Sequence, residues 1–157
     1  RMRLPEVVDT ASGLHTSGFM AACVNARRAT RPDAPQAIGV LRLIEDEAAG
    51  TLRRFAALDS ALAQAGAMAD RLVRAEDLAA RLDETTFAVL TAVGGRSAAE
   101  AAARRIAAVL ECSAWPTGET GRPASLAFAC GACEITSDAD GAAFVERARR
   151  LLETRRP

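Results

Sequence analysis

The sequence contains no lysine and no tyrosine, and its only histidine is His15. Without lysine, neither the phosphate-binding lysine of a P-loop nor a lysine Schiff base can form. These absences exclude several large classes of nucleotide-binding and carbonyl-processing enzymes.

The chain also lacks net charge and long apolar runs. Its twenty basic residues, all arginine, are balanced by twenty acidic residues. General electrostatic binding to DNA or anionic lipid needs a basic excess, which is missing here. No apolar run approaches the roughly 20 residues of a membrane-spanning helix. We therefore expect no DNA binding and no membrane insertion by this segment.

Cysteines are few, and their spacing favours no metal or redox site. Cys130 and Cys133 form a CxxC pair, but a structural zinc site needs four ligands and His15 is remote in sequence. A redox pair would favour a helix N-terminus, whereas Ser125 to Ile135 is typical of a buried strand. The sequence predicts reduced, buried thiols at all four cysteines, which are Cys23, Cys112, Cys130 and Cys133.

The 157 residues are enough for one compact domain, which we expect to span residues 1–157. Because the chain opens with Arg1 and not with Met, we expect it to be a fragment of a longer multidomain protein.

The apolar pattern predicts alternating helices and strands. Ser97 and Glu100 form a capping box that would open one of the helices. In chain order we expect a helix at Ser12–Arg28, a strand at Ala37–Ile44, a helix from Thr51 to about Val73, a hairpin within Asp77–Val93, a helix from Ser97 to about Leu110, a strand near Ala127–Glu134 and a helix after Asp140.

This order contains the split βαβ pattern of ferredoxin-like and nucleotidyl-cyclase domains. The predicted fold class is therefore α+β, with a mostly antiparallel sheet flanked by helices, mainly on one face.

Four segments resemble the GGDEF domain, which is the diguanylate cyclase fold. DTASGL at Asp9–Leu14 is similar to the family's opening motif, and VLRLI at Val40–Ile44 to its first strand. RAEDLAARLDETTFAVL at Arg74–Leu90 resembles the signature hairpin with its upstream RxxD motif, and SLAFACGACEI at Ser125–Ile135 the late strand. The resemblance covers nearly the whole chain from Asp9.

The catalytic positions of that family are replaced here. The GG(D/E)EF signature falls on Asp83, Glu84, Thr85, Thr86 and Phe87, of which only the phenylalanine is retained. The resemblance implies that the two positions at which the family has metal-binding carboxylates are occupied here by Thr85 and Arg42. Because Mg²⁺ prefers carboxylate oxygens, we expect no magnesium cofactor and no cyclase activity.

Two acidic features near these positions remain open. Glu45 and Asp46 follow the first strand and leave a rebuilt acidic site as an alternative. Asp59 falls where the family has a guanine-reading aspartate, although a lone aspartate on a helix is also typical of a solvated surface.

The RxxD motif is retained as Arg74 and Asp77, and the resemblance implies that it is a cyclic di-GMP site with Arg105 as a second arginine. An arginine fork can donate to the O6 and N7 edge of guanine, and a carboxylate can accept from its N1 and N2 hydrogens. Twenty arginines and nine aspartates give about one RxxD by chance, so the motif is informative through its position before the hairpin. The alternative is that these residues only cap and solvate a helix end.

The resemblance therefore implies a catalytically inactive cyclic di-GMP receptor in the cytoplasm of a bacterial signalling system. Its expected partners are cyclic di-GMP and another signalling protein or domain, with a second copy of the chain as one candidate. The alternative is a domain that binds no nucleotide and serves only dimerisation or partner docking. Retention of GTP at the old active site is a further alternative, disfavoured because Asp83 and Glu84 would repel phosphates.

Overall fold

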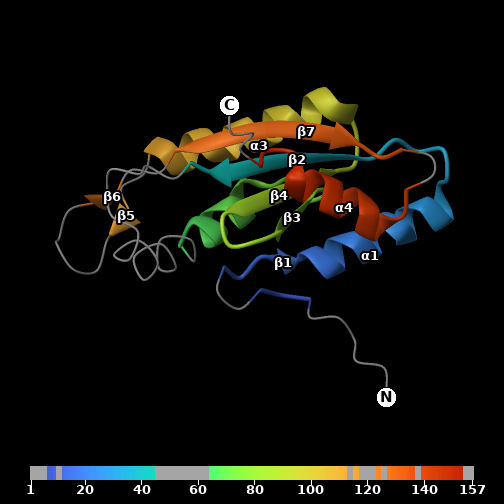
Figure 1. Ribbon diagram of the computed structural model, residues 1–157, viewed down its shortest axis with the longest axis horizontal. Coiled ribbons are helices and arrows are strands. Elements are labelled where there is room, and N and C mark those ends of the chain that lie inside the picture. The colour runs from blue at the N-terminus through green and yellow to red at the C-terminus, as the bar shows by residue number, and fades with distance from the viewer. Residues whose placement is uncertain are drawn as a thin grey trace, which may run out of the picture.

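The computed structural model describes residues 7–9, 12–44, 64–112, 115–116, 123–124, 127–136 and 139–153. A five-stranded sheet with the order β1-β3-β4-β2-β7 forms its centre (Figure 1). The strands are β1 (His15–Thr16), β2 (Ala37–Leu43), β3 (Leu78–Arg81), β4 (Thr86–Thr91) and β7 (Phe128–Glu134). Only β1 and β3 pair in parallel, and the other pairs are antiparallel. The predicted strand at Ala37–Ile44 and the predicted hairpin are confirmed.

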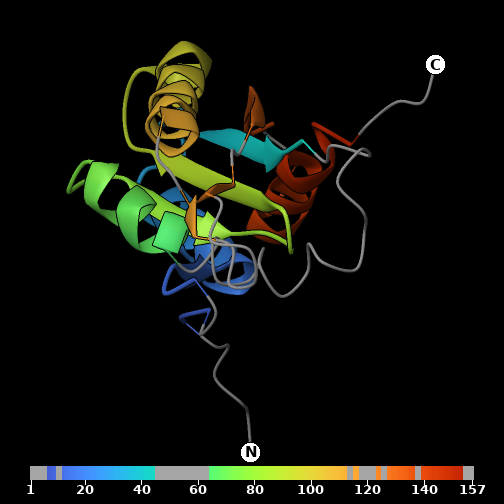
Figure 2. The same cartoon turned by 90° about the vertical axis from the view of Figure 1, so that its left-hand side faces the viewer.

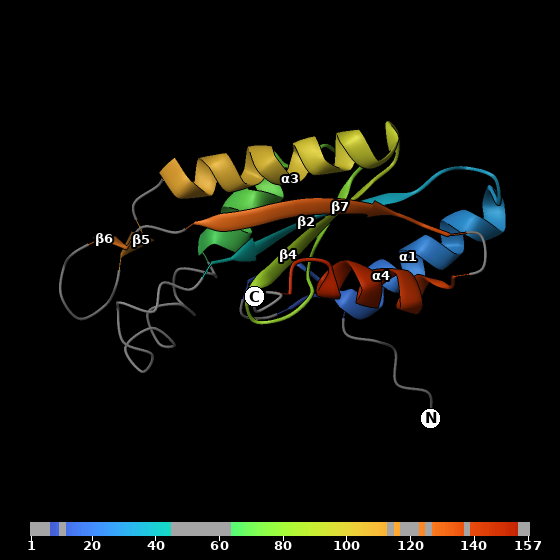
Figure 3. The same ribbon diagram turned by 45° about the horizontal axis from the view of Figure 1, so that its top comes forward.

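Helices cover both faces of this sheet. On one face, α3 (Gly95–Cys112) and a helix at 64–72 pack on a core that includes Leu41 and Phe87. On the other, α1 (Ser17–Thr30) and α4 (Gly141–Arg150) pack on a core that includes Ile38 and Val40. Figure 3 shows α3 on one side of the sheet and α1 with α4 on the other, and Figure 2 shows the same layers from the end. The expectation that helices lie mainly on one face was wrong.

The continuous apolar run of β2 reflects this two-sided burial. Six of its seven residues are buried, the exception being Arg42. A strand inside such a sandwich needs apolar side chains on both faces, so its sequence does not alternate between apolar and polar residues. Sequence and position in the sheet therefore agree for β2.

The first helix begins later than predicted, at Ser17 instead of Ser12. The Thr16 hydroxyl accepts a hydrogen bond from the Phe19 N–H at 3.1 Å and caps α1. Before it, Gly13 has a positive φ of 74° and the chain turns, so residues 12–14 cannot continue the helix. His15 and Thr16 instead pair with β3.

The predicted capping box at Ser97 is also wrong, because α3 already begins at Gly95. Its first turn is capped from another element: the Arg96 N–H donates to a carboxylate oxygen of Glu134 at 2.9 Å. Glu134 ends β7, so this contact joins residues that are far apart in sequence. A local motif could not indicate it.

The strand predicted as buried at Ser125–Ile135 is β7, which lies at the edge of the sheet. Only Phe128 and Ala132 of its seven residues are buried. Residues three apart on a strand face opposite sides, so Cys130 packs on the α3 side and Cys133 on the α4 side. The CxxC pair therefore cannot act as one site, although both thiols are half-buried.

Other predicted elements fall partly outside the described residues. Of the helix expected at 51–73, the structure describes 64–72, where Ala65 is buried and Met68 and Leu72 pack against the core. The final helix is confirmed as α4, and the Asp140 carboxylate caps it by accepting from the Ala143 N–H. The short strands β5 (Trp115–Pro116) and β6 (Pro123–Ala124) pair as a small antiparallel hairpin between α3 and β7.

Within the described residues, no helix is long and apolar enough to cross a membrane.

Candidate functional site

The RxxD segment forms the turn between the helix at 64–72 and β3. The Asp77 N–H donates to the Arg74 carbonyl oxygen at 3.0 Å and closes the turn. A carboxylate oxygen of Asp77 accepts from the Ala92 N–H, just after β4, at 3.2 Å. Arg74 is exposed and Asp77 is half-buried. The turn is thus bonded within itself and to the end of the neighbouring strand, while the Arg74 side chain faces solvent.

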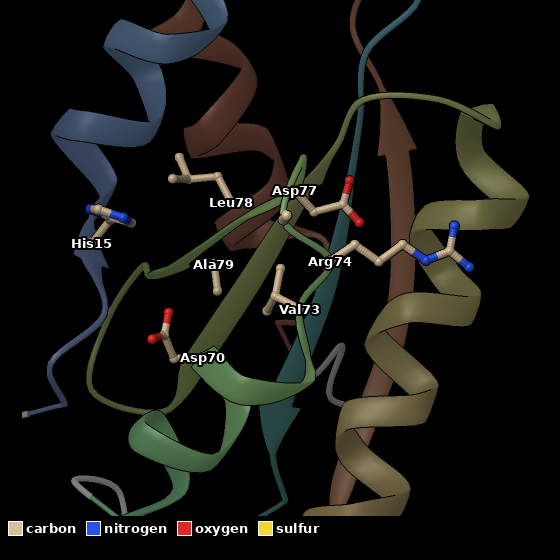
Figure 4. Close-up of a pocket in the computed structure, with 8 residues that line it drawn as sticks. His15, Asp70, Val73, Arg74, Asp77, Leu78 and Ala79 are labelled. Carbon is tan, nitrogen blue, oxygen red and sulfur yellow. The ribbon is translucent and has the colours of Figure 1, made fainter.

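Arg105 reaches the same region from α3. One of its guanidinium nitrogens lies 3.5 Å from the Leu72 carbonyl oxygen, at the end of the helix that precedes the turn. Figure 4 shows the Arg74 side chain extending from the turn toward α3. The structure therefore brings Arg74, Asp77 and Arg105 into one region, although they come from two separate parts of the chain.

A pocket of about 190 Å³ lies beside this turn, lined in part by Asp77, Asp70 and His15 (Figure 4). The His15 ring stacks on Phe19 with ring centroids 4.6 Å apart. Among the described residues, no hydrogen-bond partner meets its buried Nδ1 atom. Sequence reasoning selected neither His15 nor Asp70: Asp70 lies in the helix that leads into the turn, and only the parallel pairing of β1 with β3 brings His15 beside it.

One further residue contacts the turn from α1. Arg27 donates from a guanidinium nitrogen to the Glu76 carbonyl oxygen at 3.2 Å. Glu76 is the third residue of the RxxD segment, and the two residues are 49 positions apart. No local sequence signal could have indicated this contact.

The hairpin tip between β3 and β4 carries the replaced signature. The Asp83 carboxylate accepts from the Thr85 N–H at 3.0 Å and lies 3.5 Å from the Arg149 guanidinium of α4. Thr86 is buried, whereas Glu84 is exposed. The tip is therefore bonded to α4 through an ion pair.

Burial alone would raise the pKa of Asp83, but its neighbours reverse this. The neighbouring Thr86 side chain, hydrogen bonds from the Thr85 N–H and the Arg149 guanidinium, and the charge of Arg42 hold the pKa of Asp83 below its ordinary value. The carboxylate is therefore ionised at neutral pH.

Arg81 binds the backbone of the same tip. Its guanidinium donates to the carbonyl oxygens of Asp83 at 3.1 Å and Glu84 at 3.0 Å, and to the Asp9 carboxylate at 3.2 Å. Burial acts to raise the pKa of Asp9, but hydrogen bonds from Ser12 and Arg81 lower it overall. The two carbonyl oxygens at the hairpin tip therefore already accept hydrogen bonds from the Arg81 guanidinium.

Arg42 lies on β2 opposite Thr86 of β4. One guanidinium nitrogen is 3.4 Å from the Leu152 carbonyl oxygen, which follows α4. A guanidinium in this position donates hydrogen bonds and cannot coordinate a cation. Among the residues that the structure describes, no group of three or more His, Cys, Asp or Glu side chains is placed to hold a metal ion. Glu45, Asp46 and Asp59 lie outside the described residues.

The described thiols are unpaired and differ in exposure. Cys112 is exposed, contrary to the prediction of buried thiols, because it is the last residue of α3. Burial raises the pKa of Cys130 and of Cys133 above the ordinary value for a thiol. Neither strand thiol is therefore activated as a nucleophile.

No family model and no curated protein matches this chain. Solved structures do match it. The GGDEF domain of FimX from Pseudomonas aeruginosa is 20% identical with a TM-score of 0.74, and the alignment covers 92% of this chain and 90% of that one. The GGDEF domain of DgcB from Caulobacter crescentus, in complex with c-di-GMP, is 16% identical with a TM-score of 0.74 and coverages of 95% and 86%.

A third match is the diguanylate cyclase SiaD from Pseudomonas aeruginosa, in complex with its activator SiaC. It is 15% identical with a TM-score of 0.72, and the alignment covers 93% of this chain and 59% of SiaD. Likeness at this level of identity establishes architecture and leaves activity open. The chain has the fold of a GGDEF domain.

Proposed function

We propose that this domain is a catalytically inactive receptor for cyclic di-GMP, which binds at Arg74, Asp77 and Arg105. The observation that carries the proposal is that Arg105 of α3 contacts the Leu72 carbonyl, at the end of the helix that leads into the closed RxxD turn. Two arginines and one carboxylate in one region match the acceptor and donor edges of guanine and the charge of its phosphates.

The structural neighbours support this choice of ligand. The DgcB domain, which shares the fold, is in complex with c-di-GMP. In this chain the two proposed ligand-binding arginines, Arg74 and Arg105, are both exposed. A bound dinucleotide could therefore contact a second protein as well as this domain.

The residues of the hairpin region support the absence of catalysis. A diguanylate cyclase site needs carboxylates for Mg²⁺, and the positions that the resemblance assigns to them carry Thr85 and Arg42. The Arg42 guanidinium instead contacts the carbonyl of Leu152, and Asp83 pairs with Arg149. These residues do not fit a magnesium ion, so we expect no cofactor.

Control of a protein contact is the proposed output. SiaD, a diguanylate cyclase that contains this fold, forms a complex with a protein activator. We propose that ligand binding here changes contact with another signalling protein or with a second copy of the chain, in the bacterial cytoplasm. A ligand shifts such an equilibrium only if it binds one state more tightly, and a dinucleotide shared between two surfaces would do so.

Calorimetric titration with cyclic di-GMP tests the proposal. Wild type should bind saturably, and Arg105→Ala should lose about 1 to 3 kcal/mol of binding free energy, or roughly five- to 150-fold in affinity. Arg104→Ala is the matched control, because Arg104 is the adjacent exposed arginine and pairs with Glu100 on the helix surface at 3.0 Å. The control should bind like wild type.

Two results would contradict the proposal. If wild type does not bind, the domain is better described as a docking or dimerisation module without a nucleotide. If incubation with GTP and Mg²⁺ yields cyclic di-GMP, the domain is an active cyclase and the hairpin region has been misinterpreted.

A further inference from the structure

The RxxD turn and the helix end that precedes it are held by contacts from three other parts of the fold. Ala92 donates to the Asp77 carboxylate, Arg105 to the Leu72 carbonyl and Arg27 to the Glu76 carbonyl. Of these three contacts, only that of Arg27 joins a side chain outside the proposed ligand-binding set to a peptide group inside the RxxD segment.

This contact acts on one particular peptide unit. The carbonyl of Glu76 and the N–H of Asp77 belong to the same planar peptide group, so they can only rotate together. The carbonyl oxygen accepts from Arg27 at 3.2 Å, and the N–H donates to Arg74 at 3.0 Å. With both ends bonded, the plane has little freedom, and the Asp77 Cα that follows it is fixed as well.

The Arg27 side chain is itself anchored by a well-packed helix. Met20 and Val24 of α1 are fully buried against the core of the α1 and α4 face. Among the described residues, no acceptor meets the second terminal nitrogen of Arg27, which is buried. Leaving a buried donor unpaired costs free energy. The guanidinium is therefore not placed for its own best hydrogen bonding, and its one described acceptor is the turn.

We propose that Arg27 is a positioning residue for the ligand site: it orients the Glu76–Asp77 peptide, and through it the Asp77 carboxylate, for guanine. This inference rests on the proposed function. It means that α1, on one face of the sheet, and α3, on the other, both shape the same site. A partner that moves α1 would then change the affinity for the dinucleotide.

Three variants of the full chain separate this role from a general loss of charge. Arg27→Ala removes the contact. Arg27→Lys keeps the positive charge and a hydrogen-bond donor, but replaces the planar guanidinium with a single ammonium group. Arg31→Ala is the matched control, because it removes the same charge from the end of the same helix. Arg31 is exposed, and the control keeps the backbone N–H that donates to the Arg27 carbonyl at 2.8 Å.

Two measurements are made on each variant. The first is hydrogen exchange of the Asp77 amide by NMR without ligand, where Arg27→Ala should exchange about tenfold faster, the effect of one ordinary hydrogen bond. The second is the affinity for cyclic di-GMP by calorimetry, which should fall about three- to tenfold in Arg27→Ala. Arg27→Lys should recover part of both effects, and Arg31→Ala should behave as wild type.

Unchanged Asp77 exchange in Arg27→Ala would overturn the inference whether or not the ligand binds. Equal changes in Arg27→Ala and Arg31→Ala would also overturn it, because charge alone would then explain both. If exchange changes as expected but wild type binds no dinucleotide, the orientation of the peptide by Arg27 is supported and the proposed function is the part that fails.

Discussion

The guanidinium of Arg149 lies 3.5 Å from the carboxylate of Asp83, and this ion pair ties α4 to the tip of the β3–β4 hairpin. Both side chains are less than a third exposed, at 28% and 29%. Arg149 also bonds Glu146 of its own helix at 2.7 Å. The hairpin tip is thus a structural contact between sheet and helix, held together by charges of the protein.

The Asp83 pair makes stability depend on pH in a predictable direction. Because the pKa of Asp83 is lower in the folded chain than in the unfolded chain, folding favours its ionised form. The contribution is present above the unfolded value of about 3.9 and is lost as pH falls through the folded pKa. Urea unfolding between pH 6 and pH 2.5, on Asp83→Asn beside wild type, should show a smaller loss of stability in acid for the variant.

At neutral pH, Asp83→Asn should lower the free energy of unfolding by about 1 kcal/mol, as for a partly exposed ion pair. Glu84→Gln is the control, since Glu84 is the exposed neighbour at the same tip. An equal effect of both substitutions would mean that the loss comes from general acidity of the tip and not from the pair with Arg149.

The start of α3 gives a second prediction. Glu134→Ala removes the acceptor of the Arg96 N–H and a negative charge near the helix N-terminus. Its loss should destabilise the fold by about 0.5 to 2 kcal/mol, the usual cost of losing an N-cap. Ser97→Ala, at the position where the sequence predicted the cap, should stay within about 0.5 kcal/mol of wild type, since Ser97 is an exposed residue inside the helix. Thermal and urea unfolding of both variants measure the difference.

The strands and the cap of α3 show which features could be predicted from the sequence. Strand β2 and the hairpin follow from short-range apolar patterns, and such patterns indicated them correctly. The cap of α3 depends on Glu134, and the packing of α1 beneath the sheet depends on partners in α4. A contact between residues far apart in the sequence produces no repeating apolar pattern within either segment. The cap of α3 and the packing of α1 with α4 could therefore not be predicted.

The candidate site shows the same division. Arg74, Asp77 and Arg105 were found because the position of the RxxD motif relative to the hairpin resembles that of a known family. Arg27 and His15 lie on α1 and β1, and only the folding of the chain brings these elements beside the turn. A motif identifies the residues within its own segment but not the residues that other elements bring to it.

Thiol reactivity gives a third prediction. With an exposed Cys112 and with the pKa of Cys130 and Cys133 raised by burial, a disulfide reagent at pH 8 should modify one thiol quickly and the strand thiols slowly. Cys112→Ser should abolish the fast phase. A fast phase that persists in this variant would show that one of the half-buried thiols, Cys23, Cys130 or Cys133, is more accessible than the structure indicates.

Two glycines at which a helix backbone comes very near give the last prediction. A Cβ added at Gly141 would lie 2.1 Å from the Ala21 carbonyl oxygen, and one at Gly39 would lie 2.0 Å from that of Ala99. Neither contact can be relieved by rotating a side chain, because the atoms it meets belong to helix backbones. Gly141→Ala should therefore separate α4 from α1 and cost about 1 to 3 kcal/mol or more, as overpacking does.

Gly18→Ala is the matched control, because Gly18 is an exposed residue of α1. There the extra methyl group should stabilise the fold by up to about 1 kcal/mol, since alanine has the higher helix propensity. The two substitutions are chemically identical, so opposite signs in urea unfolding can only reflect their surroundings. If Gly141→Ala were as stable as wild type, the tight contact between α1 and α4 would be wrong, and with it the packing that anchors Arg27 beside the RxxD turn.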